Sequence, residues 1–311
     1  MRALPAVTLG LAVLVLGGCS GDSVAEIAAD PAGGATASGA PTASSSADDP
    51  MSPAVSQTHR PPPRSASPSP RSSAQAAPAQ FGTVRPGELL PTGSQCATWV
   101  RARPMTENKG VNARANRTTG HAVDGSLFSG DTAAAARVIA PRIGGRFTGT
   151  TQEILRWAAC KWGIDENIVY AQAAIESWWR MDTLGDWGTD AAACAPGHEL
   201  GADGRPGECP QSFGVMQDRW PYTKQGWPGY GRSTAMNVDI AYGIWRACYE
   251  GYETWLNTVE RGQDYGAGDT WGCVGRWFSG RWHTAAGEEY VGRVRDYLAQ
   301  RIWRTPDFQQ P

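Results

Sequence analysis

The chain has 311 residues, and its 28 Lys and Arg against 30 Asp and Glu give a net charge of −2 at pH 7. Its pI is about 6.1, and no basic face argues for nucleic acid, so we expect no such partner. The seven cysteines fit an exported protein. The four histidines are scattered and there is no CxxC or HExxH motif, so we expect neither a metal site nor a cofactor.

Residues 1–18 have the pattern of a lipoprotein signal peptide. Arg2 is followed by an apolar stretch, Ala6–Leu16, that is too short to remain as a membrane-spanning helix. The sequence LGGC that ends at Cys19 resembles a bacterial lipobox, which implies cleavage before Cys19 and lipidation of that cysteine. We therefore expect a lipid anchor at the outer face of the cytoplasmic membrane. The alternative is an ordinary cleaved signal with an incidental cysteine.

Residues 19–92 consist mostly of Ala, Ser, Pro, Gly and Thr. This composition buries too little apolar surface to offset the entropy of ordering, so we expect a disordered tether. Its random-coil reach is roughly 45–50 Å, somewhat more where proline stiffens it. Residues 93–311 remain for the folded part, which we expect to be one domain with an N-terminal extension.

The folded part is expected to be mainly α-helical, with at most a small hairpin inside 180–230. Each predicted helix has recognisable start or stop residues. The expected segments are Thr132–Ile139 capped by Asp131, a helix from the Thr150 capping box to Gly163, Ala235–Leu256 after Ser233 or Thr234, a short one from Asp269 to Ser279, and Ala285–Trp303 before Pro306.

One further helix, Asp165–Arg180, carries the most informative residue of the chain. It is apolar on nearly every side, as a buried helix is, and only Gln172 and Glu176 interrupt it late. These two residues are four apart and share a face. Burial favours the protonated form of a glutamate, and a protonated carboxylic acid beside a cleft is what cleavage of a glycosidic bond requires. The alternative is that Glu176 pairs with an arginine such as Arg180.

Six cysteines besides Cys19 can form three disulfides with fifteen connectivities. Cys194–Cys209 is the first expected pair, because it closes a Gly- and Pro-rich loop that has no core of its own. Cys248–Cys273 would tie the long helix to the next short one, which leaves Cys96–Cys160.

Four short motifs in order make the chain resemble the transglycosylase SLT domain, the lysozyme-like fold of soluble lytic transglycosylases. They are Ala174-Ile175-Glu176-Ser177, Ser212-Phe213-Gly214-Val215-Met216-Gln217, Trp277-Phe278-Ser279-Gly280 and Glu289-Tyr290-Val291-Gly292-Arg293-Val294. The resemblance covers about 150–300 and implies a lysozyme-like fold with Glu176 as the catalytic acid. It further implies that substrate is contacted by Ser177, Ser212, Gly214, Met216, Gln217, Trp277, Ser279 and Tyr290.

Two features depart from the family pattern. Trp277-Phe278 stands where the family has Tyr-Asn, which removes a hydroxyl and an amide. The segment between Glu176 and Gly214 is also longer than usual and contains Asp182, Asp186 and Asp190. Around Asp186 it is similar to goose-type lysozymes, so Asp186 is the candidate second carboxylate, although for any single aspartate we favour an ordinary loop or turn residue.

Three functions stay open at this stage, all with peptidoglycan strands as partner and a monomeric protein. A lytic transglycosylase cleaves the β-1,4 bond between N-acetylmuramic acid and N-acetylglucosamine with one carboxyl group and leaves a 1,6-anhydro product. A hydrolase of the same bond needs a second carboxylate to hold water. A peptidoglycan-binding lipoprotein that lost the chemistry is the third, and the change at Trp277-Phe278 makes it worth testing.

The fourteen tryptophans divide into two groups. Those on helices with apolar neighbours are expected in the core: Trp157, Trp245, Trp255 and Trp303. Those in Gly- and Pro-rich segments either present a flat face to sugar rings or pack in loops: Trp187, Trp220, Trp227 and Trp282.

Overall fold

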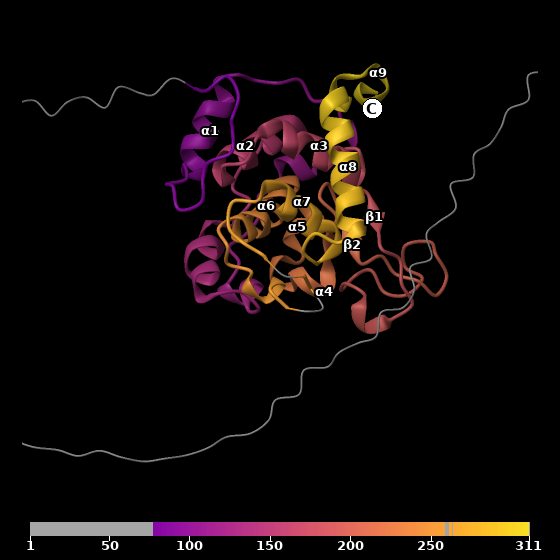
Figure 1. Ribbon diagram of the computed structural model, residues 1–311. Helices are drawn as coiled ribbons and strands as arrows, with labels where there is room; N and C mark the ends of the chain where they lie inside the picture. Colours follow the sequence, from indigo (N-terminus) through magenta and orange to yellow (C-terminus); the bar gives the residue numbers. More distant parts are fainter. Residues whose placement is uncertain (1–76, 259–260, 263, 311) are drawn as a thin grey trace, which may run out of the picture. The chain divides into compact units, whose positions relative to one another are not determined.

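The computed structural model describes residues 77–258, 261–262 and 264–310. The predicted signal peptide, Cys19 and the tether up to residue 76 lie outside the described residues. The described part is mainly helical and contains three disulfides (Figure 1). None of its helices combines the length and the apolar character that a membrane crossing requires.

The helices and strands follow one another along the chain, joined by short 3₁₀ turns. The α-helices are α1 Gly93–Arg101, α2 Thr151–Trp162, α3 Glu166–Ser177, α4 Trp220–Thr223, α5 Gly229–Arg232, α6 Thr234–Tyr249, α7 Thr270–Ser279, α8 Ala285–Gln300 and α9 Pro306–Gln309. The strands are β1 Leu184–Gly185, β2 Ser212–Phe213 and β3 Asp218–Arg219.

The predicted caps of α2 and α3 are confirmed. The Thr150 side chain accepts the Glu153 N–H while the Glu153 carboxylate accepts the Thr150 N–H, and Gly163 ends α2 with φ +60°. The Asp165 carboxylate accepts the N–H groups that begin α3. We expected α3 to reach Arg180, but it ends at Ser177, because Trp178 and Trp179 take left-handed conformations, φ 58° and 62°.

Three predicted helices differ from those observed. Asp131 does not cap a helix; its carboxylate accepts from the Trp255 indole, and the segment forms a π-helical turn over Ala135–Ile139. The segment predicted over Ala235–Leu256 stops at Tyr249, since Gly251 turns the chain at φ 82°. The last one stops at Gln300 rather than Trp303, because Arg301 is left-handed, φ 48°. The caps at Ser233 and Asp269 are confirmed.

The folded part begins before residue 93, so the predicted end of the tether at 92 is too late. Phe81 is buried and its N–H donates to the Glu166 carboxylate. Val84 accepts from the Arg246 guanidinium at 2.8 Å and donates its own N–H to Gly163. One buried aromatic side chain and a few backbone hydrogen bonds hold residues 77–92 against the helices. The composition of these residues did not reveal such contacts.

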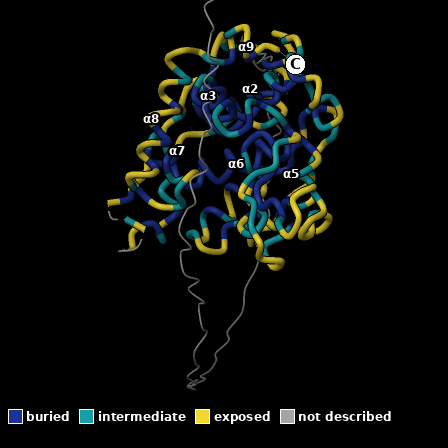
Figure 2. Tube along the Cα trace, turned by 90° about the vertical axis from the view of Figure 1, so that its right-hand side faces the viewer, coloured by how far each residue is buried: buried dark blue, intermediate teal, exposed yellow. Residues whose placement is uncertain are grey.

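Helices α3 and α6 lie in the core, and α8 packs along α3 with α7 beside it (Figures 1 and 2). Three of the four tryptophans expected in the core are there, Trp157, Trp245 and Trp303. Trp255 is only partly buried, because its ring lies between surface arginines and donates to Asp131. The predicted pairs Cys96–Cys160, Cys194–Cys209 and Cys248–Cys273 are all confirmed.

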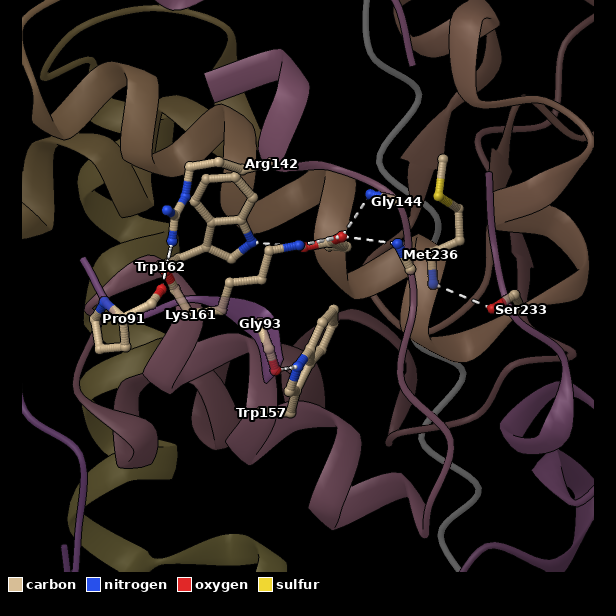
Figure 3. A network of polar contacts seen from close by, with 11 residues as sticks. Pro91, Gly93, Arg142, Gly144, Trp157, Lys161, Trp162, Ser233 and Met236 are labelled. Atoms are coloured by element: carbon tan, nitrogen blue, oxygen red, sulfur yellow. Dashed lines mark hydrogen bonds and ion pairs between the residues drawn. The ribbon is translucent and has the colours of Figure 1, made fainter. Parts of the chain in front are cut away.

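A buried polar network joins α2 to α6. The Asp239 carboxylate on α6 accepts from Lys161 Nζ at 2.6 Å and from the Trp162 indole N–H at 2.8 Å. It also accepts the backbone N–H groups of Gly144 and Gly145 (Figure 3). Because a buried carboxylate is costly unless all its lone pairs are used, these four donors hold α6 in one position against α2.

The predicted hairpin in 180–230 is part of a three-stranded antiparallel sheet, ordered β1-β2-β3. Leu184 pairs with Phe213 and Gly185 with Ser212, and Ser212 and Phe213 pair on their other side with Arg219 and Asp218. The residues from 186 to 211 form the connection between β1 and β2 and include the Cys194–Cys209 loop. The sheet meets α3 because Ser177 Oγ donates to the Val215 carbonyl at 2.8 Å.

Candidate active site

Glu176 lies in the last turn of α3, partly exposed, where the helix meets the sheet. The hydroxyl of Tyr290, on α8, donates to its Oε1. The alternative pairing with Arg180 is not observed, because Arg180 forms an ion pair with Asp182 at 2.9 Å instead. Among the described residues no cation forms a salt bridge with Glu176, and a carboxyl group without such a partner remains available for proton transfer.

The pKa of Glu176 is raised from its ordinary value of 4.5 to about 7, and burial is the main cause. The nearby charge of Asp186 raises this pKa further, while hydrogen bonds from Tyr290 and Trp277 and the charge of Arg293 lower it. Near neutral pH the group is therefore protonated in about half of the molecules, which is the condition under which one carboxyl can act as an acid and then as a base.

Tyr290 and Tyr242 surround Glu176 with groups that stay neutral. Burial raises the pKa of both phenols well above 10, and Glu176 contributes in the same direction. Tyr242 donates to the Val169 carbonyl at 3.2 Å and to Gln172 Oε1 at 3.4 Å. Gln172, which was expected to share a face with Glu176, is buried beside these phenols.

The turn between β2 and β3 is held mainly by backbone geometry. Gly214 has φ 78°, and a Cβ there would lie 2.7 Å from the Asn237 amide. Asn237 accepts the Met216 N–H at 2.8 Å and donates to the Phe213 carbonyl at 2.8 Å. The backbone of Gln217 is in the left-handed region, and its side-chain amide donates to the Gly214 carbonyl. These contacts fix the turn after β2, in which Met216 is fully buried, and Ser177 joins that turn to the end of α3.

Asp186 lies just after β1, with about half of its side chain exposed. It accepts from Ser212 Oγ at 2.5 Å and lies 3.9 Å from Arg219 Nε. It is near enough to Glu176 for its charge to raise the pKa of that group. Of the other two aspartates, Asp182 pairs with Arg180 and Asp190 caps the turn Ala191–Ala193, as their interpretation as loop residues predicted.

Asp218 is a second acid near Glu176 that the sequence analysis missed. It is 0% exposed, and neither carboxylate oxygen has a hydrogen-bond partner among the described residues. Burial raises the pKa of Asp218 well above 3.8, and the Glu176 charge adds to this. Both effects favour the protonated form of this acid. Its position directly after Gln217, in a strand next to the sheet turn, was the available signal.

The last turn of α7 contains three of the predicted motif residues, and their surroundings differ. Trp277 is partly buried and lies near enough to Glu176 to lower its pKa slightly. Phe278 is 51% exposed and stacks on Tyr290, with ring centroids 4.9 Å apart and planes 5° from parallel. Ser279 Oγ bonds to the Gly275 and Arg281 carbonyls at the end of α7, and no contact with Glu176 is found in the described part.

The four loop tryptophans do not form one surface. Trp282 is buried against Tyr265, so it is not available to a sugar. Trp220 and Trp227 pack edge to face, and Trp227 also contacts Phe213 of β2. Trp187 is partly exposed beside Asp186, with the Arg205 guanidinium 4.2 Å from its ring centroid.

No group of three or more His, Cys, Asp or Glu residues in the described ranges could hold a metal ion. In comparisons with known proteins, no protein-family model, no curated protein and no solved structure matches this chain. Its function is therefore inferred from its sequence motifs and from the geometry around Glu176.

Proposed function

We propose that this protein is a peptidoglycan lytic transglycosylase with a lysozyme-like fold and that Glu176 is its acid and base. The observation that carries this proposal is the partly exposed carboxyl group at the end of α3, with a pKa of about 7, a phenol donor and no salt bridge in the described residues. The motif resemblance around Glu176, Gly214 and Tyr290 supports the same function.

The proposed reaction needs one ionisable group of the protein. Glu176 donates its proton to the glycosidic oxygen while the N-acetyl carbonyl of the substrate attacks the anomeric carbon, which breaks the glycosidic bond. The resulting carboxylate then accepts the proton of the sugar 6-hydroxyl, and that oxygen displaces the acetamido oxygen and closes the 1,6-anhydro ring. Tyr290 stabilises the carboxylate formed between the two steps.

A hydrolase that acts on the same bond is the second candidate, and two acids favour it. Asp186 is near enough for its charge to act on Glu176, and it is held by Ser212, so it could orient a water molecule. Asp218 is close enough for its pKa to respond to Glu176, but it has no exposed surface and is therefore less suited to hold a water molecule. A non-catalytic peptidoglycan-binding lipoprotein is the third, supported by the change at Trp277-Phe278.

Mass spectrometry of peptidoglycan digested with the full chain tests these candidates, since anhydro and reducing ends differ by one water. We expect anhydro ends from the wild type, almost none from Glu176→Gln, and near wild-type amounts from Asp186→Asn. Reducing ends from the wild type, together with loss of cleavage in Asp186→Asn or Asp218→Asn, would make the protein a hydrolase. Binding without any cleavage would leave the non-catalytic binder.

We further propose that the protein is anchored through a lipid on Cys19, at the outer face of the cytoplasmic membrane. The LGGC sequence after a short apolar run supports this. Cys19→Ala should release the protein from the membrane fraction or stall its processing. Unchanged fractionation of this variant would contradict the anchor.

A further inference from the structure

A depression of about 600 Å³ lies where α3 and α7 begin and α8 nears its end. It is lined by Asp165 and Asn167 of the α3 start, by Thr270 and Trp271 of the α7 start, and by Leu298 of α8, together with Thr83, Ile168, Gly268 and Asp269. Asp165 and Glu176 are at opposite ends of α3, roughly 16 Å apart along its axis. The depression is therefore separate from the candidate active site.

The depression contains one aromatic platform. Trp271 is partly exposed, and its ring forms part of the lining. The Arg295 guanidinium, on α8, lies 4.4 Å from the centroid of that ring. A cation over an indole is attracted to the ring, so Arg295 covers one face of Trp271 and restrains the ring, and a ligand would use the opposite face. A pre-oriented indole offers flat apolar area at little cost in conformational entropy.

The polar groups around Trp271 are of two kinds. The Asn167 amide and the Thr270 hydroxyl form no hydrogen bond to any other described side chain or backbone group, so both are available to a ligand. The carboxylates of Asp165 and Asp269 are fixed, because each accepts a helix N–H at 2.8 Å through one oxygen, while the other oxygen contacts Gln80 at 3.3 Å in Asp165 and His283 at 2.7 Å in Asp269. Their remaining lone pairs can accept hydrogen bonds from hydroxyl groups.

We propose that this depression is a second saccharide-binding site, which holds a short stretch of β-1,4-linked amino-sugar strand away from the point of cleavage. A sugar ring has an apolar C–H face that fits an indole and hydroxyls that fit fixed carboxylates, an amide and a hydroxyl. The choice of glycan rests on the proposed function, but the site itself rests on the depression and the groups that line it.

Binding of a β-1,4-linked N-acetylglucosamine tetrasaccharide to the full-length Glu176→Gln protein tests this proposal without cleavage. The indole N–H resonances are followed by NMR, and Trp271→Phe assigns the resonance of Trp271. We expect that resonance to shift on titration. We also expect Trp271→Ala, and more weakly Asn167→Ala, to reduce affinity at this site about tenfold, which corresponds to about 1.4 kcal/mol. Trp99→Ala is the matched control, since Trp99 is also partly buried but lies on α1 outside the depression.

A second measurement uses Trp271→Ala with Glu176 intact. We expect weaker retention on insoluble peptidoglycan but unchanged turnover of short soluble fragments. If the Trp271 resonance does not move, or if Trp271→Ala and Trp99→Ala bind the tetrasaccharide equally, the second site is wrong. If the tetrasaccharide binds at Trp271 but the wild type cleaves no glycan, the proposed function fails and the second site stands.

Discussion

Helix α3 carries two glutamates whose surroundings differ, Glu166 in its first turn and Glu176 in its last. Glu166 is buried, forms an ion pair with Arg156 at 3.2 Å and accepts the Phe81 N–H, so its carboxylate is compensated by groups that the fold brings to it. Glu176 has no salt-bridge cation among the described residues, and its hydrogen bond comes from the Tyr290 phenol, which cannot neutralise a charge. A carboxyl group with a cationic partner stabilises the fold, whereas one with only a neutral partner is free to exchange a proton. The kind of partner matters more here than the depth of burial.

The largest expected effect is on activity. Glu176→Gln keeps the shape and hydrogen bonding of the side chain but cannot donate a proton, so we expect cleavage to fall by about 10³-fold or more. Stability near neutral pH should not fall, because the variant removes a carboxyl that ionises at a cost. Product release from labelled peptidoglycan and thermal unfolding at pH 7 measure the two effects. A variant that still cleaves would show that Glu176 is not the acid.

Glu166→Gln should give the opposite result. It leaves the Arg156 guanidinium buried without its charge partner, and we expect a loss of about 3 kcal/mol in the free energy of unfolding. Cleavage per folded molecule should be unchanged, since Glu166 and Glu176 are at opposite ends of α3. Urea denaturation and an activity assay well below the transition provide the test. A loss of activity that exceeds the loss of folded protein would contradict the comparison.

The pH dependence of stability should reveal the raised pKa of Glu176. The pKa of Glu176 is about 7 in the folded protein against 4.5 ordinarily, so between these values the folded state binds more protons than the unfolded state. This contribution stabilises the protein below pH 4.5, falls as pH rises, and is lost above about 7. The unfolding free energy of Glu176→Gln relative to wild type should therefore increase from pH 4.5 to 7. A constant difference would mean that the pKa is not raised.

The smallest expected effect comes from Tyr290→Phe. Removing the phenol deletes a hydrogen bond that lowers the pKa of Glu176, so this pKa should rise. We expect activity at neutral pH to fall by roughly tenfold, as one hydrogen bond to a charged group is lost. The alkaline limb of the pH–activity profile should move to higher pH. Phe278→Ala is the control, since it removes the ring stacked on Tyr290 without removing the hydroxyl. An unchanged alkaline limb in Tyr290→Phe would contradict the role of the phenol.

The sequence alone predicted features set by near neighbours in the chain. Thr150 and Glu153 define the start of α2, Gly163 its end, and Asp165 the start of α3, because caps use groups within a few residues. The Cys194–Cys209 pair could be predicted for a similar reason, since the two cysteines are separated by only 15 positions in the sequence. The sequence of Asp165–Arg180 likewise indicated that Glu176 is a lone acidic residue near the end of an apolar helix.

Only the tertiary structure decided which groups meet Glu176. Tyr290 is 114 residues away in sequence and reaches it because α8 packs along α3. Asp218 is buried near it because the register of β2 and β3 places it opposite Phe213, where the short strand gave no alternation to read. Residues 77–92 join the fold through Phe81 and Val84, which find partners on α2, α3 and α6. Such contacts depend on which surfaces pack together, and a local pattern of residues does not contain that information.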